Sequence, residues 1–381
     1  MVIQVTGINF INKGAEVMLH AILKEVSTWD EVNAVAADLR IGSFGERNRA
    51  GLAHLMVPYS MKFSLLARAF SAGFGLIPEP IRNQLNCVAE KDVDLVLDAS
   101  GFALSDQWGP GMANSLKHKF QEARRKGARI VMLPQAFGPF NRPEVRTAAQ
   151  DVLNLVDFVF AREPQSLEYL QDLGISDSKC AMAPDFTNLL KAPKPSVPEE
   201  SYACVVPNYR MVDMTAEGIE DAYVQFLCES VRKVEKSGLP VRVVLHTTNP
   251  QDRSLGEIVC NWTDAKLFTP SDAIEVKRII GESEFVISSR FHGLVNALSQ
   301  GVPAAATGWS HKYQYLMEEY DCADYLISMQ TSLDEQLSRV NQIMDKRESI
   351  REHIKDPASL QRTRTHQMWN QVQELAMSIT A

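Results

Sequence analysis

Short apolar runs alternate with helix-patterned segments along most of the chain. Residues 2–6 form a β-branched run, which a turn and a helical pattern over residues 14–26 follow. This βα alternation is typical of parallel strands covered by helices on both faces, so we expect an α/β fold. Further strands are expected at 93–97, 128–133, 156–161, 202–206, 241–246, 285–288 and 304–307, and further helices at 121–126, 220–237, 272–281 and 293–299.

The segment 191–201 interrupts the pattern. It holds three prolines and has no apolar periodicity, which favours a linker. Because the βα pattern restarts after it, we predict two Rossmann-like domains, residues 1–190 and 202–355, that face a cleft. The final segment, 356–381, is expected to be a helix that packs back on them. Ligands of such sheets bind at the carboxyl ends of the strands.

Charge and cysteine usage narrow the class of protein. The net charge of −8 over 381 residues argues against a nucleic-acid binder, which needs a basic face to neutralise phosphates. The six cysteines form no C-x-x-C pair, which fits a reducing cytoplasm and gives no zinc-site pattern. The stretch 63–81 is apolar but is interrupted by Arg68, serines and glycines. We therefore expect no transmembrane segment there, but either a helix packed on the core or an amphipathic element at a membrane surface.

The segment 285–313 carries the most informative chemistry. The expected strand 285–288 is followed by Ser289 and Arg290, and His292 lies where the next helix opens. Backbone N–H groups at a helix N-terminus attract anions, and a guanidinium fork matches phosphate or carboxylate. A histidine side chain exchanges a proton near neutral pH. After the next expected strand come His311 and Lys312, which a parallel sheet would place at the same edge.

Each of these residues also has a purely structural interpretation. Arg290 alone could form a surface ion pair, and His292 alone could be a core or helix-capping histidine. His246, which ends the expected strand 241–246, either faces the ligand edge or simply caps its strand. The grouping of Arg290, His292, His311 and Lys312 at successive strand ends favours function over these alternatives.

The segment 288–313 resembles the polysaccharide pyruvyltransferase family. The segments SSRFHG (288–293), ALSQGVP (297–303) and GWSHKY (308–313) are similar to its C-terminal signature. The N-terminal half agrees in order and spacing, although its DASG turn is less glycine-rich than the family's usual form. The matching segments are Asn12–Glu16, Asp98–Gly101, Pro134–Pro139, Ala161–Glu163 with Ser166, and Pro184–Asp185.

The resemblance covers roughly residues 1–330 and implies a fold similar to that of GT-B glycosyltransferases. It also implies phosphoenolpyruvate as the donor, whose pyruvyl group becomes a ketal on a sugar, with an Arg-x-His pair at the donor. That pair maps onto Arg290 and His292, and a second donor arginine maps onto Arg210. We expect Ser289 and Lys312 to assist donor binding, His292 to act as general acid and base, and His311 to be the reserve for that role. No metal or other cofactor is expected.

The acceptor is expected against the N-terminal domain. Two of the candidates have structural alternatives, because Glu16 also suits the first turn of a helix and Gln135 also suits a loop. Arg162 is expected to pair with Glu163 or Asp185. The acceptor-binding candidates are Asn12, Lys13, Glu16, Ser100 and Gln135.

Two rival functions share this fold, because a fold does not fix a function. One is a nucleotide-sugar glycosyltransferase, in which Glu318 or Glu319 would hold the ribose. The other is a non-catalytic protein that binds a glycan or phosphate. The resemblance favours a cytoplasmic enzyme of surface-glycan assembly, at the inner face of the membrane where the acceptor is lipid-linked. The sequence leaves open the acceptor sugar, the ketal position and stereochemistry, and whether the protein is a homo-oligomer.

Overall fold

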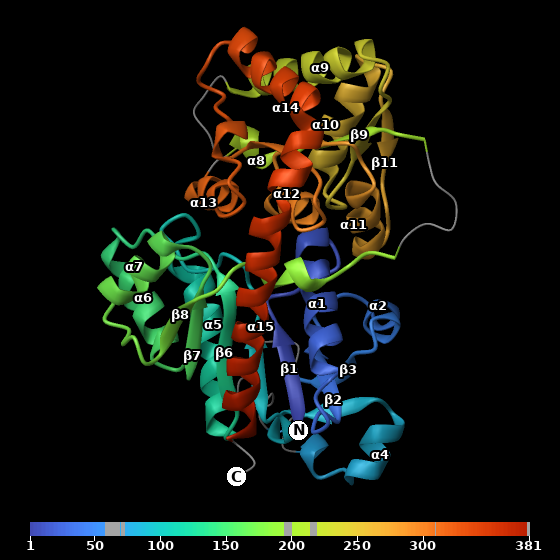
Figure 1. Ribbon diagram of the computed structural model, residues 1–381. Helices are drawn as coiled ribbons and strands as arrows, with labels where there is room; N and C mark the ends of the chain where they lie inside the picture. The colour runs from blue at the N-terminus through green and yellow to red at the C-terminus, as the bar shows by residue number, and fades with distance from the viewer. Residues whose placement is uncertain (58–68, 70–72, 194–199, 214–218, 309, 379–381) are drawn as a thin grey trace. The chain divides into compact units, whose positions relative to one another are not determined.

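The computed structural model describes residues 1–57, 69, 73–193, 200–213, 219–308 and 310–378. The chain divides into two compact units (Figure 1). The first unit is formed by Met1–Phe10, Met18–Phe186 and Thr365–Ala381, and the second by Ile11–Val17 and Thr187–Arg364. Each unit has its own parallel sheet.

The sheet of the first unit has the strand order β4-β3-β2-β1-β5-β6-β7-β8 among the described residues, and every neighbouring pair is parallel. Strands β5 and β7 are buried along their whole length, as strands covered on both faces should be. The strands are β1 (Val2–Thr6), β2 (Ala34–Asp38), β3 (Ala53–Met56), β4 (Cys87–Ala89), β5 (Leu95–Asp98), β6 (Arg129–Gln135), β7 (Phe158–Ala161) and β8 (Cys180–Met182). The helices are α1 (Lys13–Val26), α2 (Phe44–Arg49), α4 (Glu79–Gln84), α5 (Gly109–Arg125), α6 (Pro143–Leu153) and α7 (Pro164–Asp172).

The second unit repeats this architecture with the order β11-β10-β9-β12-β13-β14, again parallel throughout. Its strands are β9 (Ala203–Val206), β10 (Val241–Val244), β11 (Lys266–Phe268), β12 (Val286–Ser288), β13 (Ala304–Thr307) and β14 (Leu326–Ile327). Its helices are α8 (Arg210–Asp213), α9 (Ile219–Lys236), α10 (Pro250–Asn261), α11 (Ala273–Gly281), α12 (Phe291–Leu298), α13 (His311–Glu319) and α14 (Leu333–His353).

Local sequence explains where the helices of the second unit begin and which face they bury. Asp272 caps α11 by accepting the N–H groups of Ile274 (2.6 Å) and Glu275 (3.3 Å). Asn249 caps α10, and Pro250 occupies the first helical position, where its missing N–H costs nothing. Helix α9 buries one apolar stripe at helical spacing: Tyr223, Phe226, Leu227, Val231 and Val234.

The last helix, α15 (Lys355–Met377), is shared between the units, because its residues from Thr365 onward belong to the first unit. Trp369 packs edge-on against Trp29 and Phe186, with ring centroids 6.2 Å and 5.7 Å away. Near the end of the helix, Arg129 donates to the Leu375 carbonyl at 3.2 Å. Aromatic burial therefore fixes the C-terminal tail on the N-terminal sheet.

The expected α/β architecture with two parallel sheets is confirmed. The unit boundaries differ from the predicted ones at three places: residues 11–17 and 187–190 belong to the second unit, and the first unit regains the chain at Thr365. These differences arise from long-range contacts, which local patterning does not report. Within the stretch 63–81, residues 63–68 and 70–72 lie outside the described residues.

We predict that Trp369→Ala lowers the free energy of unfolding of the first unit by about 3–5 kcal/mol, because the ring is buried between two aromatic partners. Urea denaturation followed by tryptophan fluorescence and limited proteolysis of α15 would measure this. Trp262→Ala is the matched control, since that ring is 66% exposed and its loss should change stability by less than about 0.5 kcal/mol. Equal denaturation midpoints for the two variants would contradict the packing described here.

Candidate active site

The central strands β9 and β12 mark the point where the strand order of the second unit reverses. Ligands of doubly wound sheets bind outside the carboxyl ends of the strands at such a switch point. The loops that follow these two strands are tied together by Asn208. Its side-chain amide donates to the Ser289 carbonyl at 2.9 Å, and its backbone N–H donates to the Tyr223 hydroxyl at 3.1 Å. The candidate site is built on this pair of loops.

Arg290 is the N-cap residue of α12 and is held by a buried carboxylate. Its guanidinium pairs with Asp252 of α10, whose side chain is 2% exposed. The other carboxylate oxygen of Asp252 accepts the Tyr209 N–H at 2.7 Å. One carboxylate thus joins three loops of the sheet edge and fixes the guanidinium beside the N-terminus of α12.

Ser289 supports this loop from behind. It is fully buried, and its hydroxyl bonds the Tyr223 hydroxyl at 2.6 Å and the Thr307 hydroxyl at 2.5 Å. Its carbonyl accepts the Tyr313 hydroxyl at 3.1 Å. The side chain expected to bind the donor is therefore engaged inside the protein, and its observed role is to hold the Arg290 loop in place.

Residues 11–17 reach the same site from the other end of the chain. The Lys13 N–H donates to the His246 carbonyl at 3.0 Å, and the Thr248 N–H donates to the Ile11 carbonyl at 3.1 Å. A Cβ on Gly14 would lie 2.5 Å from Nδ1 of His292, so only glycine fits against this imidazole. The N-terminal turn therefore belongs to the His292 side, which corrects the expectation that Asn12, Lys13 and Glu16 lie with the N-terminal domain.

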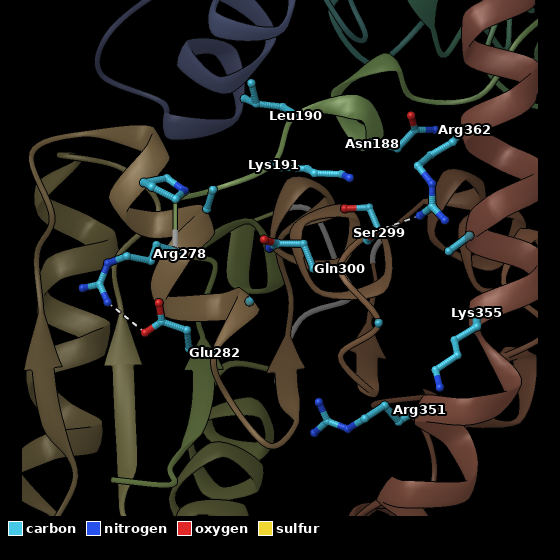
Figure 2. A pocket seen from close by; sticks show the side chains of 15 residues that line it. Asn188, Leu190, Lys191, Arg278, Glu282, Ser299, Gln300, Arg351, Lys355 and Arg362 are labelled. Atoms are coloured by element: carbon cyan, nitrogen blue, oxygen red, sulfur yellow. Dashed lines mark hydrogen bonds and ion pairs between the residues drawn. The ribbon is translucent and has the colours of Figure 1, made fainter. Parts of the chain in front are cut away.

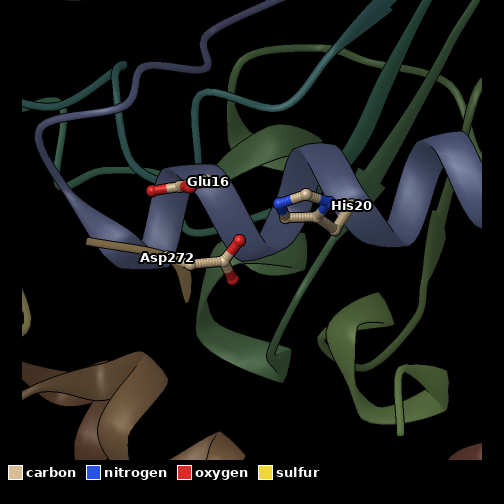
Figure 3. A group of neighbouring side chains, drawn as sticks. All are labelled: Glu16, His20 and Asp272. Atoms are coloured by element: carbon tan, nitrogen blue, oxygen red, sulfur yellow. The ribbon is translucent and has the colours of Figure 1, made fainter. Parts of the chain in front are cut away.

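These three N-terminal residues already have partners within the second unit. The Lys13 ammonium donates to Glu16 and to the Ser271 carbonyl, both at 2.6 Å, and the Asn12 side chain accepts the Gly14 N–H at 3.0 Å. Carboxylate oxygens of Glu16 and Asp272 lie within 4.8 Å of each other, and His20 lies one turn further along α1 (Figure 3). Lys13 supplies the positive charge that faces Glu16 and anchors the start of α1.

The remaining donor-side candidates lie on neighbouring loops of the same edge. Lys312, at the start of α13, has its ammonium 5.8 Å from the centre of the Phe291 ring, and His311 packs edge-on against Tyr315. Arg210 follows β9 at the start of α8, is exposed, and pairs with Asp213 at 2.6 Å. Parallel pairing of β9, β12 and β13 places all these loops at one edge.

Positive charge gathers around His246. Burial holds its pKa well below the usual histidine range, and the nearby charges of Arg290, His292 and Lys13 lower the pKa further. The ring is 1% exposed, and its Nε2 lies 3.5 Å from the side-chain nitrogen of Asn296. The imidazole is therefore held in its neutral form next to the loops that carry Arg290 and Lys13.

The sheet edge of the first unit carries a second polar group of residues. The Ser100 hydroxyl donates to Asp98 at 2.7 Å, and the Gln135 amide donates to the other Asp98 oxygen at 3.0 Å. Burial raises the pKa of Asp98. Gln135 is fully buried, and its amide oxygen has no hydrogen-bond partner among the described residues. Asp98 and Gln135 end β5 and β6, and Ser100 follows β5, next to the switch point between β1 and β5.

Other motif residues of the first unit hold the fold together. Arg162 and Asp185 form a buried ion pair at 3.2 Å, which is one of the two pairings expected for Arg162. Glu163 bonds the Ser166 hydroxyl, which also accepts the Phe137 N–H at 2.7 Å. A Cβ on Gly138 would meet the Tyr169 ring at 2.4 Å, which explains the glycine in that loop.

The family model described as polysaccharide pyruvyl transferase matches residues 12–311, which include Asp98, Asp252, Arg290 and His292. The chain belongs to the polysaccharide pyruvyl transferase family. A curated relative, the amylovoran biosynthesis protein AmsJ of Erwinia amylovora, is 19% identical over 288 residues, which cover 69% of this chain and 68% of the relative. Membership supports a transferase activity in polysaccharide biosynthesis.

Solved structures of other proteins have a similar fold. HepE of Anabaena, in complex with UDP-glucose, has a TM-score of 0.62 and 13% identity, with 99% of both chains covered. A putative UDP-N-acetylglucosamine 2-epimerase of Listeria monocytogenes gives 0.59 and 14%, covering 93% of this chain and 90% of that one. A glycosyltransferase of Rickettsia africae gives 0.57 and 14%, covering 100% and 98%. At these identities the likeness shows only that this pyruvyl transferase has the GT-B-type fold.

Sequence reasoning missed Asp252, Asn208 and Tyr223 in this pyruvyl transferase. Asp252 lies in the first turn of α10, where an acidic residue is ordinary and gives no functional signal. Asn208 precedes Arg210 by two residues, so its place after β9 was the available clue.

None of the described helices combines the length and apolar character that crossing a bilayer requires.

We predict that His246 makes the stability of this pyruvyl transferase depend on pH. Its folded-state pKa is depressed, so below about pH 6.5 the unfolded chain binds a proton that the folded chain refuses. Stability is therefore retained above this pH and lost as the pH falls, by up to about 1.4 kcal/mol per pH unit.

Urea denaturation of wild type and His246→Gln between pH 7.5 and 5 would measure that contribution. The difference between the two proteins should shrink as the pH falls, whereas the exposed His353→Gln variant should follow wild type. Parallel pH profiles for wild type and His246→Gln would contradict the burial of a neutral imidazole.

Proposed function

We propose that this family member transfers the pyruvyl group of phosphoenolpyruvate to two hydroxyls of a sugar as a ketal, in the cytoplasmic assembly of a surface polysaccharide. The observation that carries the proposal is Arg290, which buried Asp252 fixes beside His292 at the switch point of the second unit. The relative AmsJ, named for amylovoran biosynthesis, supports the polysaccharide context.

The donor carries a carboxylate and a phosphate, so its site needs more than one cation. Arg290 offers a planar fork that suits either group, and its pairing with Asp252 pre-sets the orientation of that fork. Lys312 and Arg210 lie on the loops after β13 and β9 and provide further positive charge at the same edge. The N-terminal backbone of α12 adds a partial positive charge.

The chemistry balances without an added oxidant or metal. His292 donates a proton to C3 of the enol, which becomes a methyl group, while positive charge develops at C2. One sugar hydroxyl forms a bond to C2, and the C2–O bond to phosphate breaks. A second hydroxyl then completes the ketal. The two hydroxyl protons replace the proton that His292 gave to C3 and protonate the departing phosphate. We assign His292 as general acid and base, with His311 as the alternative.

We place the sugar acceptor on the sheet edge of the first unit. Ser100 is half-buried and donates its hydroxyl proton to Asp98, so its oxygen lone pairs remain to accept a hydrogen bond from a sugar hydroxyl. Gln135 is fully buried, and its amide holds the Asp98 carboxylate to which Ser100 donates. Ser100 follows β5 and Gln135 ends β6, and these two strands pair in parallel.

A nucleotide sugar is the alternative donor, because HepE is described in complex with UDP-glucose and shares the fold. The sequence offered Glu318 and Glu319 as partners for a ribose. Glu318 is exposed and accepts the Gln314 side chain at 2.8 Å near the end of α13. Neither Glu318 nor Glu319 is buried, and both lie in the last turn of α13.

We predict that Arg290→Ala raises the Kd for phosphoenolpyruvate about 10–100-fold, the effect of losing charge-assisted hydrogen bonds worth about 1.5–3 kcal/mol. Isothermal titration calorimetry would measure this. Arg290→Lys keeps a charge for Asp252 but loses the fork, so it should also bind weakly. Arg253→Ala is the control, since that side chain is 54% exposed and pairs with Glu257. Binding of UDP-glucose but not phosphoenolpyruvate by wild type would overturn the donor assignment.

We predict that His292→Asn lowers the rate of phosphate release about 10²–10⁴-fold while leaving phosphoenolpyruvate binding nearly intact. Phosphate release would be measured with a panel of saccharide acceptors, and donor affinity by calorimetry. His311→Asn should retain most of the activity. A larger loss in His311→Asn than in His292→Asn would transfer the proton-transfer role to His311.

A further inference from the structure

A basic pocket lies within the second unit, away from the Arg290 edge. Its volume is about 670 Å³, and its lining comes from the segment after Leu190, the C-terminal ends of α11 and α12, and the α14–α15 junction (Figure 2). Pockets of this size hold small molecules. None of the residues assigned to the donor or acceptor lines it.

Positive side chains enter this pocket from separate segments. Figure 2 shows Lys191, Arg351, Lys355 and Arg362 around one open space, whereas Arg278 points away toward Glu282, with which it pairs at 2.8 Å. The four cations belong to the segment after Leu190, the end of α14, and α15. Like charges brought together from three segments favour occupation by an anion.

Ion pairing inside the protein neutralises only part of this charge. Arg351 pairs with Glu284 at 3.4 Å, and Lys355 pairs with Glu352 at 2.5 Å. Lys191 and Arg362 have no carboxylate partner among the described residues. A phosphate monoester carries about −1.5 to −2 charges at pH 7, which matches these two remaining positive charges.

Arg362 also has a structural role, because it contacts the C-terminal end of α12. Its guanidinium lies 3.5 Å from the carbonyl of Ser299, the C-cap residue of α12, where the helix dipole is negative. A guanidinium has five N–H donors, so this contact leaves others for a ligand. Lys191, by contrast, makes no hydrogen bond to the described part of the chain and has no comparable structural function.

We propose that this pocket binds a phosphate or diphosphate group of a small molecule or lipid headgroup, at a site separate from the donor site. The forks of Arg362 and Arg351 engage phosphate oxygens in pairs, and Lys191 and Lys355 contribute point charges. The proposal does not depend on the identity of the donor, because it rests on residues that the pyruvyl transfer does not use.

The test measures inorganic pyrophosphate binding by calorimetry in the Arg290→Ala background, which removes the other anion site, and again in wild type. Lys191→Gln and Lys191→Gln/Arg362→Gln should raise the Kd, the double variant about tenfold or more. Added salt should weaken binding in the parent protein. The control pair Lys236→Gln/Arg364→Gln removes two exposed cations outside the pocket and should bind like the parent.

Thermal denaturation without ligand shows whether the Arg362→Gln change in the double variant destabilises the fold. Lys191→Gln remains informative in that case, because its folded state should be intact. Unchanged pyrophosphate affinity in both pocket variants would overturn the proposal, as would complete loss of binding in Arg290→Ala alone. Co-sedimentation with phosphatidylglycerol vesicles, compared with phosphatidylcholine, distinguishes the sources. Vesicle binding that the pocket variants abolish indicates a lipid headgroup, and pyrophosphate binding alone indicates a soluble compound.

Discussion

The pairing of Asp252 with Arg290 is the interaction on which the ligand edge of the second unit depends. Asp252 is buried on α10, yet it reaches Arg290 after β12 and the Tyr209 N–H after β9. Removing one partner of a buried pair typically costs about 3–5 kcal/mol, because the other charge is left without compensation. The orientation of the guanidinium is therefore coupled to the stability of three segments at the sheet edge, and the fork is already oriented there.

Hydroxyl groups behind this pair hold the Arg290 loop in place. Those of Ser289, Tyr223 and Thr307 bond one another, so these buried hydroxyls need no solvent. Cations remain at the surface of the edge, and His246 beneath them is held neutral by burial and by their charge.

The sequence was sufficient to predict those strands and site residues whose signals lie close together along the chain. Apolar runs located β1, β9, β12 and β13 to within one or two residues, and the turn after β12 identified Arg290 and His292 because charge, glycine and helix start are adjacent there. Contacts distant in sequence were not visible. Asp252 lies 38 residues from its partner. The turn at 11–17 joins the second unit through hydrogen bonds to residues near 246, which no periodicity encodes. The side chain of Ser289 points into the core, an orientation that its position beside Arg290 did not disclose.

Helix α12 links the features of the second unit through its own electrostatics. Its eight residues span only about 12 Å, with Arg290 and His292 at the N-terminal end and Ser299 at the C-terminal end. The N-terminal end is partially positive and favours an anion directly. The C-terminal end is partially negative, so an anion can approach it only where added cations outweigh that charge. Arg362 lies against the Ser299 carbonyl at that end, and Lys191 belongs to the same pocket. The same dipole therefore requires different side chains at the two ends, which is the arrangement that the structure shows.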